Sequence, residues 1–240
     1  MEILKKIQNK INGRTKIQVL AFIDFYFRKR NLYSCGGPFN GQDRRKEIFK
    51  DILNVIPFDA IIETGTYGGR TTEYLACQKN IPVHTVEINP RLFFYSRFKL
   101  RRYRNVHLYL NNSVQFLEQM GNDRHFRGEK IFFYLDAHDG RECLPLRDEV
   151  DLICSHFSEF IIMIDDFQVP GDPGYGFDDY GKDKRLTLDY LQLHRFPDIQ
   201  AFFPMAPSFE ETGGKKGSVV LVSKGQMLEK ISDLKSLKKL

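Results

Sequence analysis

Acidic residues end four short apolar runs of this sequence, and carboxylates in such places can hold a polar ligand. The runs end at Glu63, at Glu87, at Asp136 and at the neighbours Asp165 and Asp166. If these runs are parallel strands of one open sheet, their carboxyl ends lie along the edge where ligands bind in α/β proteins. Carboxylates at a partly buried edge are costly unless they are paired or bound. The row of acids therefore predicts a ligand site.

Three glycines follow Glu63 closely, in the stretch IIETGTYGGR. Glycine lets the backbone turn tightly and approach a ligand, and a helix that begins after the turn would point its free N–H groups at the same place. Glu87 lies 22 residues after Gly65, where an acid accepts hydrogen bonds from ribose hydroxyls. The spacing Gly65-x-x-Gly68-Gly69 differs from GxGxxG, so the pattern predicts an adenosine-containing ligand without the standard dinucleotide fingerprint.

The later acids predict a reacting centre. Asp136 is followed two residues on by His138, and Asp165 and Asp166 end the next apolar run. Carboxylates that converge from neighbouring strands suit Mg²⁺, and an imidazole among them also allows Mn²⁺ or Fe²⁺. A cation there would stabilise an oxyanion nucleophile. Two alternatives stay open: His138 or Asp136 acts as a general base without a metal, or Asp165 or Asp166 only caps a loop through backbone N–H groups.

Alternating elements must position these residues. Strand-like and helix-like segments alternate regularly from residue 59 to residue 166, which is typical of βαβ units and a parallel sheet. The expected strands are 59–63, 83–87, 106–110, 130–136 and 160–166, and the expected helices are 70–78, 90–103, 113–120 and 145–157. Two more strands, 199–204 and 218–223, have no clear helix between them, so we expect them to pair antiparallel at one edge of the sheet.

Several of these stretches resemble a known family. ETGTYGGRTT followed by TVE resembles the first two motifs of class I S-adenosylmethionine (SAM)-dependent methyltransferases, and NNSVQFL resembles their next motif. LDAH and MIDDFQVPGDPGYGFDDYG look like a bacterial subgroup whose substrates are mostly undefined. The resemblance spans about residues 37–224. It implies a Rossmann-like, doubly wound α/β fold with a seven-stranded, mostly parallel sheet whose last strand is antiparallel.

The resemblance also implies roles for individual residues. In this family the acid before the glycines lies near the methionine moiety of SAM, the glycine turn wraps the cofactor, the next acid holds the ribose and a residue after strand three lies near the adenine. The matching positions are Glu63; Gly65, Thr66 and Gly69; Glu87; and Ser113. Some metal-dependent O-methyltransferases place acids at similar strand ends. The candidate metal ligands are therefore Asp136, His138, Asp165 and Asp166, and the candidate catalytic residues are Asp136, His138 and Asp165.

The domain organisation follows from the same pattern. We expect a helical extension or cap over residues 1–55, a SAM-binding domain over 56–224 and a C-terminal helix over 225–240. The function this predicts is methyl transfer from SAM to a hydroxyl of a small molecule or carbohydrate, with a divalent metal left open. Two alternatives are an oxidoreductase, which the missing GxGxxG argues against, and a binding module without transfer activity, which the intact row of acids argues against.

Charge and composition bear on partners and location. Residues 1–50 hold twelve Lys/Arg against four Asp/Glu, within a net charge of +5. No nucleic-acid-binding signature accompanies this charge, which argues against a nucleic-acid partner. The basic N-terminal helix either packs over the domain or lies on an anionic membrane surface, and a homo-oligomer stays open. No signal peptide, bilayer-length apolar run or CxxC pair is visible, so a cytoplasmic location is expected. The sequence does not identify the acceptor.

Overall fold

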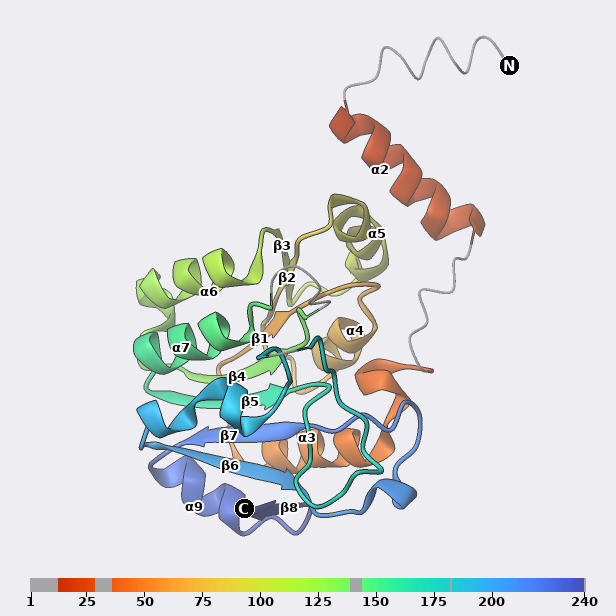
Figure 1. Ribbon diagram of the computed structural model, residues 1–240. Helices are drawn as coiled ribbons and strands as arrows, with labels where there is room; N and C mark the ends of the chain where they lie inside the picture. Colours follow the sequence, from red (N-terminus) through yellow and green to blue (C-terminus); the bar gives the residue numbers. More distant parts are fainter. Residues whose placement is uncertain (1–12, 29–35, 139–143, 182, 240) are drawn as a thin grey trace, which may run out of the picture.

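The computed structural model describes residues 13–28, 36–138, 144–181 and 183–239. Most of them form one layered unit, with helices on both faces of a central sheet (Figure 1). Within the described residues the sheet has eight strands in the order β3-β2-β1-β4-β5-β7-β6-β8. The strands are β1 (Ala60–Thr64), β2 (Val83–Glu87), β3 (Val106–Leu110), β4 (Lys130–Leu135), β5 (Glu159–Ile164), β6 (Ile199–Pro204), β7 (Val219–Ser223) and β8 (Leu237–Lys239).

The strand directions confirm the predicted α/β class. Strands β1 to β5 pair in parallel, and β7 is antiparallel to both β5 and β6. The order reverses direction at β1, which places a switch point between β1 and β4, where open sheets bind their ligands. The two strands expected to form an antiparallel edge pair are β6 and β7.

Helices and short turns connect the strands. The helices are α2 (Gly13–Ile23), α3 (Asp43–Val55), α4 (Arg70–Ala76), α5 (Pro90–Leu100), α6 (Ser113–Asn122), α7 (Leu146–His156), α8 (Leu188–Leu191) and α9 (Gln226–Ser232). A π-helix, η1 (Asp24–Arg28), follows α2. The short 3-10 helices are η2 (Pro38–Gly41), η3 (Arg124–Phe126), η4 (Leu193–Arg195) and η5 (Ser208–Glu210). Helices α5 and α6 begin where the side chains of Asn89 and Asn112 accept hydrogen bonds from the first free N–H groups, as good N-caps do.

Alternation along the central strands divides the core into two layers. Ile62, Phe133 and Ile162 pack with α6 and α7 on one face. Their neighbours in sequence, Phe132 and Ile161, pack with α3 and α9 on the other face. Because both faces are covered, β4 and β5 are apolar almost throughout, which is typical of parallel strands.

The C-terminal region corrects one expectation. Helix α9 ends at Ser232, and Leu237–Lys239 form β8 beside β6. The helix expected over 225–240 is therefore wrong in its second half, and the sheet has eight strands instead of seven. An added strand satisfies the open edge of β6 with backbone hydrogen bonds. Seven residues make only a marginal helix without strong packing, so strand pairing prevails after Ser232.

The two N-terminal helices lie in different places. Helix α3 packs against the sheet through Ile48, Phe49 and Ile52. Helix α2 extends away from the layered unit and rests on α5 (Figure 1). None of the helices in the described part of the chain has both the length and the apolar character needed to cross a bilayer. The division into three parts at residues 55 and 224 stays a prediction.

Candidate functional site

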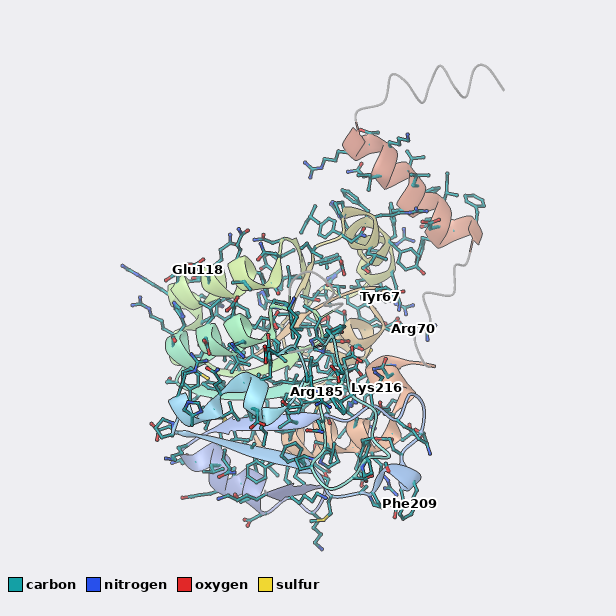
Figure 2. The ribbon with its side chains drawn as sticks, viewed as in Figure 1. Tyr67, Arg70, Glu118, Arg185, Phe209 and Lys216 are labelled. Atoms are coloured by element: carbon teal, nitrogen blue, oxygen red, sulfur yellow. The ribbon has the colours of Figure 1, made fainter. Side chains whose placement is uncertain are left out.

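The carboxyl ends of β1, β4 and β5 bring the predicted acids together. The ladder continues past the strands, because the Asp136 N–H donates to the Thr64 carbonyl at 3.0 Å and the Asp165 N–H donates to the Leu135 carbonyl at 3.1 Å. Figure 2 labels Tyr67 and Arg70 of the glycine turn and Lys216 and Arg185 of two later loops. The site is assembled from the ends of strands that are far apart in the sequence.

The glycine turn passes directly over the end of β4. Gly65 has a φ of +90°, and a Cβ built on it would lie 2.3 Å from the Asp136 carbonyl oxygen. Only glycine combines that left-handed conformation with so close an approach. Gly69, with φ +67°, begins α4 and packs near Leu100 of α5. The turn thus joins the predicted cofactor region to the predicted reacting centre.

Glu63 is fully buried beneath the turn. Its Oε2 accepts hydrogen bonds from the Thr72 hydroxyl at 2.5 Å and the Thr85 hydroxyl at 2.6 Å, and its Oε1 has no hydrogen-bond partner in the described part of the chain. Burial raises the pKa of this carboxyl to about 7, against the two hydroxyls, which lower it. The Thr66 and Thr85 hydroxyls lie 2.6 Å apart. Glu63 therefore presents one unengaged carboxylate oxygen to the inside of the turn.

Glu87 is held by backbone groups on both of its oxygens. Tyr67 N–H donates to Oε2 at 2.7 Å, and Asn89 N–H donates to Oε1 at 2.8 Å. A carboxylate oxygen has two lone pairs, so each oxygen can accept a further hydrogen bond from a diol. These backbone contacts also fix the glycine turn against the end of β2.

Ser113, the first residue of α6, adjoins a buried carboxyl that sequence reasoning missed. Glu149 of α7 is completely buried, and neither of its oxygens has a hydrogen-bond partner within the described residues. Burial raises the pKa of Glu149 to about 7, while the nearby Ser113 and Thr64 hydroxyls lower it. A signal existed, because Glu149 lies three residues after Leu146 and four before Ile153 on the buried face of α7.

Asp165 forms an ion pair with a residue from the N-terminal part of the chain. Its Oδ1 accepts from Arg45 of α3, and both side chains are 1% exposed or less. Its Oδ2 accepts from the Tyr134 hydroxyl at 2.5 Å and from the Asn40 amide at 3.3 Å. Burial raises the pKa of Asp165, but Arg45 and Tyr134 outweigh it and hold that pKa below its usual value.

Arg45 is fixed by more than Asp165. Its Nη2 donates to the Lys216 carbonyl at 2.6 Å and to the Gly217 carbonyl at 3.1 Å. The guanidinium therefore ties α3, the end of β5 and the loop before β7 together. Sequence reasoning missed Arg45, although it precedes Ile48 and Phe49 by three and four residues on the apolar face of α3.

The other three candidate residues form a separate cluster. Asp136, His138 and Asp166 each offer a ligand atom, and these atoms lie within 4.8 Å of one another. Burial and the Asp165 charge raise the pKa of Asp136 well above its usual value and that of Asp166 to about 8. The Asn40 amide lies 3.5 Å from Asp166 Oδ1. The charge of Arg45 lowers the pKa of both acids and the charge of Lys216 lowers that of Asp166, but burial and Asp165 raise these pKa values by more.

His138 has one engaged and one unengaged ring nitrogen. Nε2 lies 3.2 Å from the Asp165 carbonyl oxygen and must donate to it, because a carbonyl can only accept. Nδ1 is buried and has no partner within the described residues. Burial lowers the pKa of His138, which favours the neutral ring. Its Nδ1 lone pair is therefore available to a cation or a proton.

The long loop between β5 and α8 closes over this edge with its own polar contacts. The Tyr180 hydroxyl lies 2.5 Å from both the His138 carbonyl and Asp178 Oδ2, and Lys216 Nζ donates to Asp178 Oδ1 at 2.5 Å. Asp179 pairs with Arg185. The side chains of Asp178 and Tyr180 thus hold this loop at the backbone of His138.

Two solved structures with this architecture contain a cofactor. The O-methyltransferase from Bacillus cereus in complex with SAH aligns with a TM-score of 0.58 at 16% identity, over 93% of this chain and 98% of that chain. The O-methyltransferase TomG from Streptomyces achromogenes, involved in Tomaymycin synthesis and solved with SAM, aligns with a TM-score of 0.54 at 12% identity, over 90% and 92%. At such identities the likeness confirms the fold.

Comparison with models of protein families finds no match. Comparison with curated proteins finds none either.

Proposed function

We propose that this protein is a SAM-dependent methyltransferase that modifies a hydroxyl group of a small molecule or carbohydrate. The observation that carries the proposal is the edge shared by β1, β2 and β4, where Glu87 and the glycine turn adjoin a buried cluster of carboxylates and an imidazole. The likeness in fold to O-methyltransferases supports the same reading. SAM supplies an activated methyl group, so the protein must hold it, orient an acceptor oxygen and receive a proton.

Each part of the glycine turn has a task in holding SAM. Glu87, which already accepts from the Tyr67 and Asn89 N–H groups, would also accept hydrogen bonds from the ribose hydroxyls. Gly65 lets the backbone lie against β4, and the unengaged oxygen of Glu63 fits a donor from the amino-acid end of the cofactor. Thr66, Gly69 and Ser113 complete the set of cofactor-binding residues that the family resemblance implies.

A divalent cation fits the cluster formed by Asp136, His138 and Asp166. Three buried or partly buried carboxylates converge here, and Asp165 is the one that forms an ion pair with Arg45. Two carboxylates and an unengaged imidazole nitrogen remain, a donor set suited to Mg²⁺ or Mn²⁺. Such an ion would lower the pKa of an acceptor hydroxyl and stabilise the oxyanion. We therefore assign Asp165 to positioning and leave it out of the ligand set.

A second mechanism uses no metal and rests on the same unengaged nitrogen. His138 is neutral and has its Nε2 proton fixed by the Asp165 carbonyl, so Nδ1 can take the proton from an acceptor hydroxyl. Tyr180 and Asp178 hold the loop over this nitrogen and limit access of water. A metal-binding measurement separates the two mechanisms, because only the first needs the carboxylates of Asp136 and Asp166 as ligands.

Calorimetric titration with SAM tests the proposal. Purified, chelator-treated protein should bind SAM with a dissociation constant in the micromolar range, which corresponds to about −8 kcal/mol. NAD serves as the matched control, because a nicotinamide-dependent oxidoreductase on this fold would bind it instead. If neither SAM nor SAH produces heat, the methyltransferase proposal is wrong. If SAM binds and no hydroxyl compound is methylated, the protein is a binding module.

A further inference from the structure

An exposed aromatic surface lies at the junction of α2, η1 and α5, and none of its residues belongs to the candidate site. We call Val19, Phe22, Tyr26 and Phe27 the N-terminal aromatic surface. Their exposed fractions are 45%, 42%, 40% and 75%. Figure 1 shows α2 extending beyond the layered unit, so one side of this surface faces solvent.

Aromatic packing fixes this surface to α5. Phe22, Phe25 and Tyr26 each contact the ring of Phe98, with centroids 5.6, 6.1 and 6.3 Å apart. The buried Asp24 accepts from Arg91 Nε at 2.6 Å and anchors η1 to the start of α5. The exposed rings therefore belong to a braced helix–helix unit whose inner side is already occupied.

The charge around the exposed rings is entirely positive. Arg14 and Lys16 of α2, Arg97 of α5 and Arg101, which follows α5, are exposed. Arg101 donates to the Tyr26 hydroxyl at 2.8 Å. Residues 90–105 contain no acid. Asp24 is the sole acid in 13–28, and it is buried in its pair with Arg91. A partner that fits must therefore combine an apolar layer with negative charge.

Charge decides between the two obvious occupants. A second copy of this chain would bring two basic, acid-free surfaces together, and like charges across an interface oppose association. An anionic bilayer offers an apolar interior for the rings and phosphate or carboxylate groups for the arginines. Helices with exposed aromatics on one face and Lys/Arg beside them lie in such interfaces.

We propose that the N-terminal aromatic surface binds anionic phospholipid bilayers and docks the protein on them peripherally. Phe27 and Phe22 enter the headgroup boundary, and Lys16, Arg97 and Arg101 contact the lipid phosphates. Each basic residue near an anionic surface contributes about a fivefold gain in binding, which is the equivalent of about 1 kcal/mol. This surface is separate from the candidate site, so the proposal does not depend on the proposed function.

The absence of tryptophan from the chain makes a direct test available. Phe27→Trp places a single indole on the surface, and its fluorescence reports entry into a bilayer. We expect a blue shift with vesicles of phosphatidylcholine and phosphatidylserine, and little shift with phosphatidylcholine alone. Adding Arg97→Glu and Arg101→Glu should weaken vesicle binding by tenfold or more, taking about fivefold for each charge lost. High salt should weaken it as well.

Phe209→Trp is the matched control, because Phe209 is 78% exposed and lies at the opposite end of the molecule (Figure 2). Its emission should not change with either kind of vesicle. Equal shifts for the two variants, or equal shifts with both kinds of vesicle, would overturn the proposal. A third outcome would also overturn the proposal: the emission of the Phe27→Trp variant does not change with vesicles but shifts with protein concentration as a dimer forms. The surface would then bind a second copy of the chain.

Discussion

The carboxylates at the two halves of the candidate site are satisfied in different ways. On the cofactor side, Glu63 accepts from hydroxyls 9 and 22 residues away in the sequence, and Glu87 accepts from backbone groups 20 and 2 residues away. On the reacting side, Asp165 depends on Arg45, 120 residues away, and on Asn40, 125 residues away. One half is built locally, whereas the other is completed by the N-terminal segment.

The comparison explains how charge is distributed at the strand ends. Local hydroxyl and N–H donors satisfy the acids of the cofactor side without an ion pair, so these side chains stay acceptors for further donors. The guanidinium of Arg45 pairs directly with one acid of three on the reacting side. The pKa values of the other two stay raised, although the charge of Arg45 also lowers them. Those two, with His138, are the groups to which a cation or an acceptor would bind.

Removal of Arg45 should have the largest effect, because it takes away the cation of the buried pair on the reacting side. Arg45→Met leaves the buried Asp165 without its cation, and breaking a buried pair in this way should lower the free energy of unfolding by about 3–5 kcal/mol. Urea unfolding followed by circular dichroism measures it. Arg44→Met is the control, since Arg44 is 40% exposed and forms surface pairs that contribute about 1 kcal/mol at most.

A double variant, called the pair variant, tests whether the loss of stability comes from the unpaired charge of Asp165. Arg45→Met combined with Asp165→Asn removes both charges, so it should recover much of the stability that the single change loses. If Arg45→Met costs no more than Arg44→Met, the buried ion pair does not organise the reacting side.

Gly65→Ala tests whether the two halves are in contact. The new Cβ would meet the Asp136 carbonyl at 2.3 Å in a left-handed conformation. Left-handed strain costs about 1–2 kcal/mol, and overpacking adds about 1–3 kcal/mol. Gly171→Ala has similar strain at φ +77° with open space around it, so it should show the strain alone. Thermal or urea unfolding measures the loss of stability. Equal losses in the free energy of unfolding for Gly65→Ala and Gly171→Ala would contradict the close approach of Gly65 to the Asp136 carbonyl.

Glu87→Ala tests the locally built half. If Glu87 holds the ribose, its loss should weaken SAM binding by about 1.5–3 kcal/mol, the range for hydrogen bonds to a charged group. Calorimetry measures the affinity, and Glu118→Ala on α6 (Figure 2) should leave it unchanged. Unaltered SAM affinity in Glu87→Ala would remove the ribose assignment.

The smallest expected effect is a pH dependence of stability that comes from His84, a residue outside both halves of the candidate site. His84 on β2 stacks on His107 at 4.7 Å, and burial, followed by the charge of His107, lowers its pKa from 6.5 to about 4. The unfolded chain therefore binds this proton more readily between pH 4 and 6.5, so stability falls as the pH drops through that window. Urea midpoints at several pH values should fall less for His84→Asn than for the wild type, and parallel curves would contradict the assignment.

The sequence patterns predicted those parts of the structure that form through interactions between residues close in the sequence. Alternation of apolar runs gave the parallel strands, and the spacing of Glu63, Gly65 and Glu87 located the turn that the structure forms. The sequence alone did not predict β8, because strand pairing at the β6 edge outweighs the helical pattern after Ser232.

The reacting side was predicted less completely. The strand ends identified the acids, but no spacing connects Arg45 to Asp165. The pairing follows from packing α3 on the sheet, which is a tertiary interaction. A charged residue on the apolar stripe of α3 was the available signal, and the same kind of signal marks Glu149 on α7.

A titration of metal-free protein with Mn²⁺ tests the central claim most directly. Calorimetry is performed on the wild type, on Asp166→Asn and on the Arg45→Met and Asp165→Asn pair variant. If the ligands are Asp136, His138 and Asp166, the pair variant should bind Mn²⁺ like the wild type, and Asp166→Asn should bind it at least tenfold more weakly. Wild-type affinity in Asp166→Asn, together with loss of binding in the pair variant, would contradict the account and return Asp165 to the ligand set.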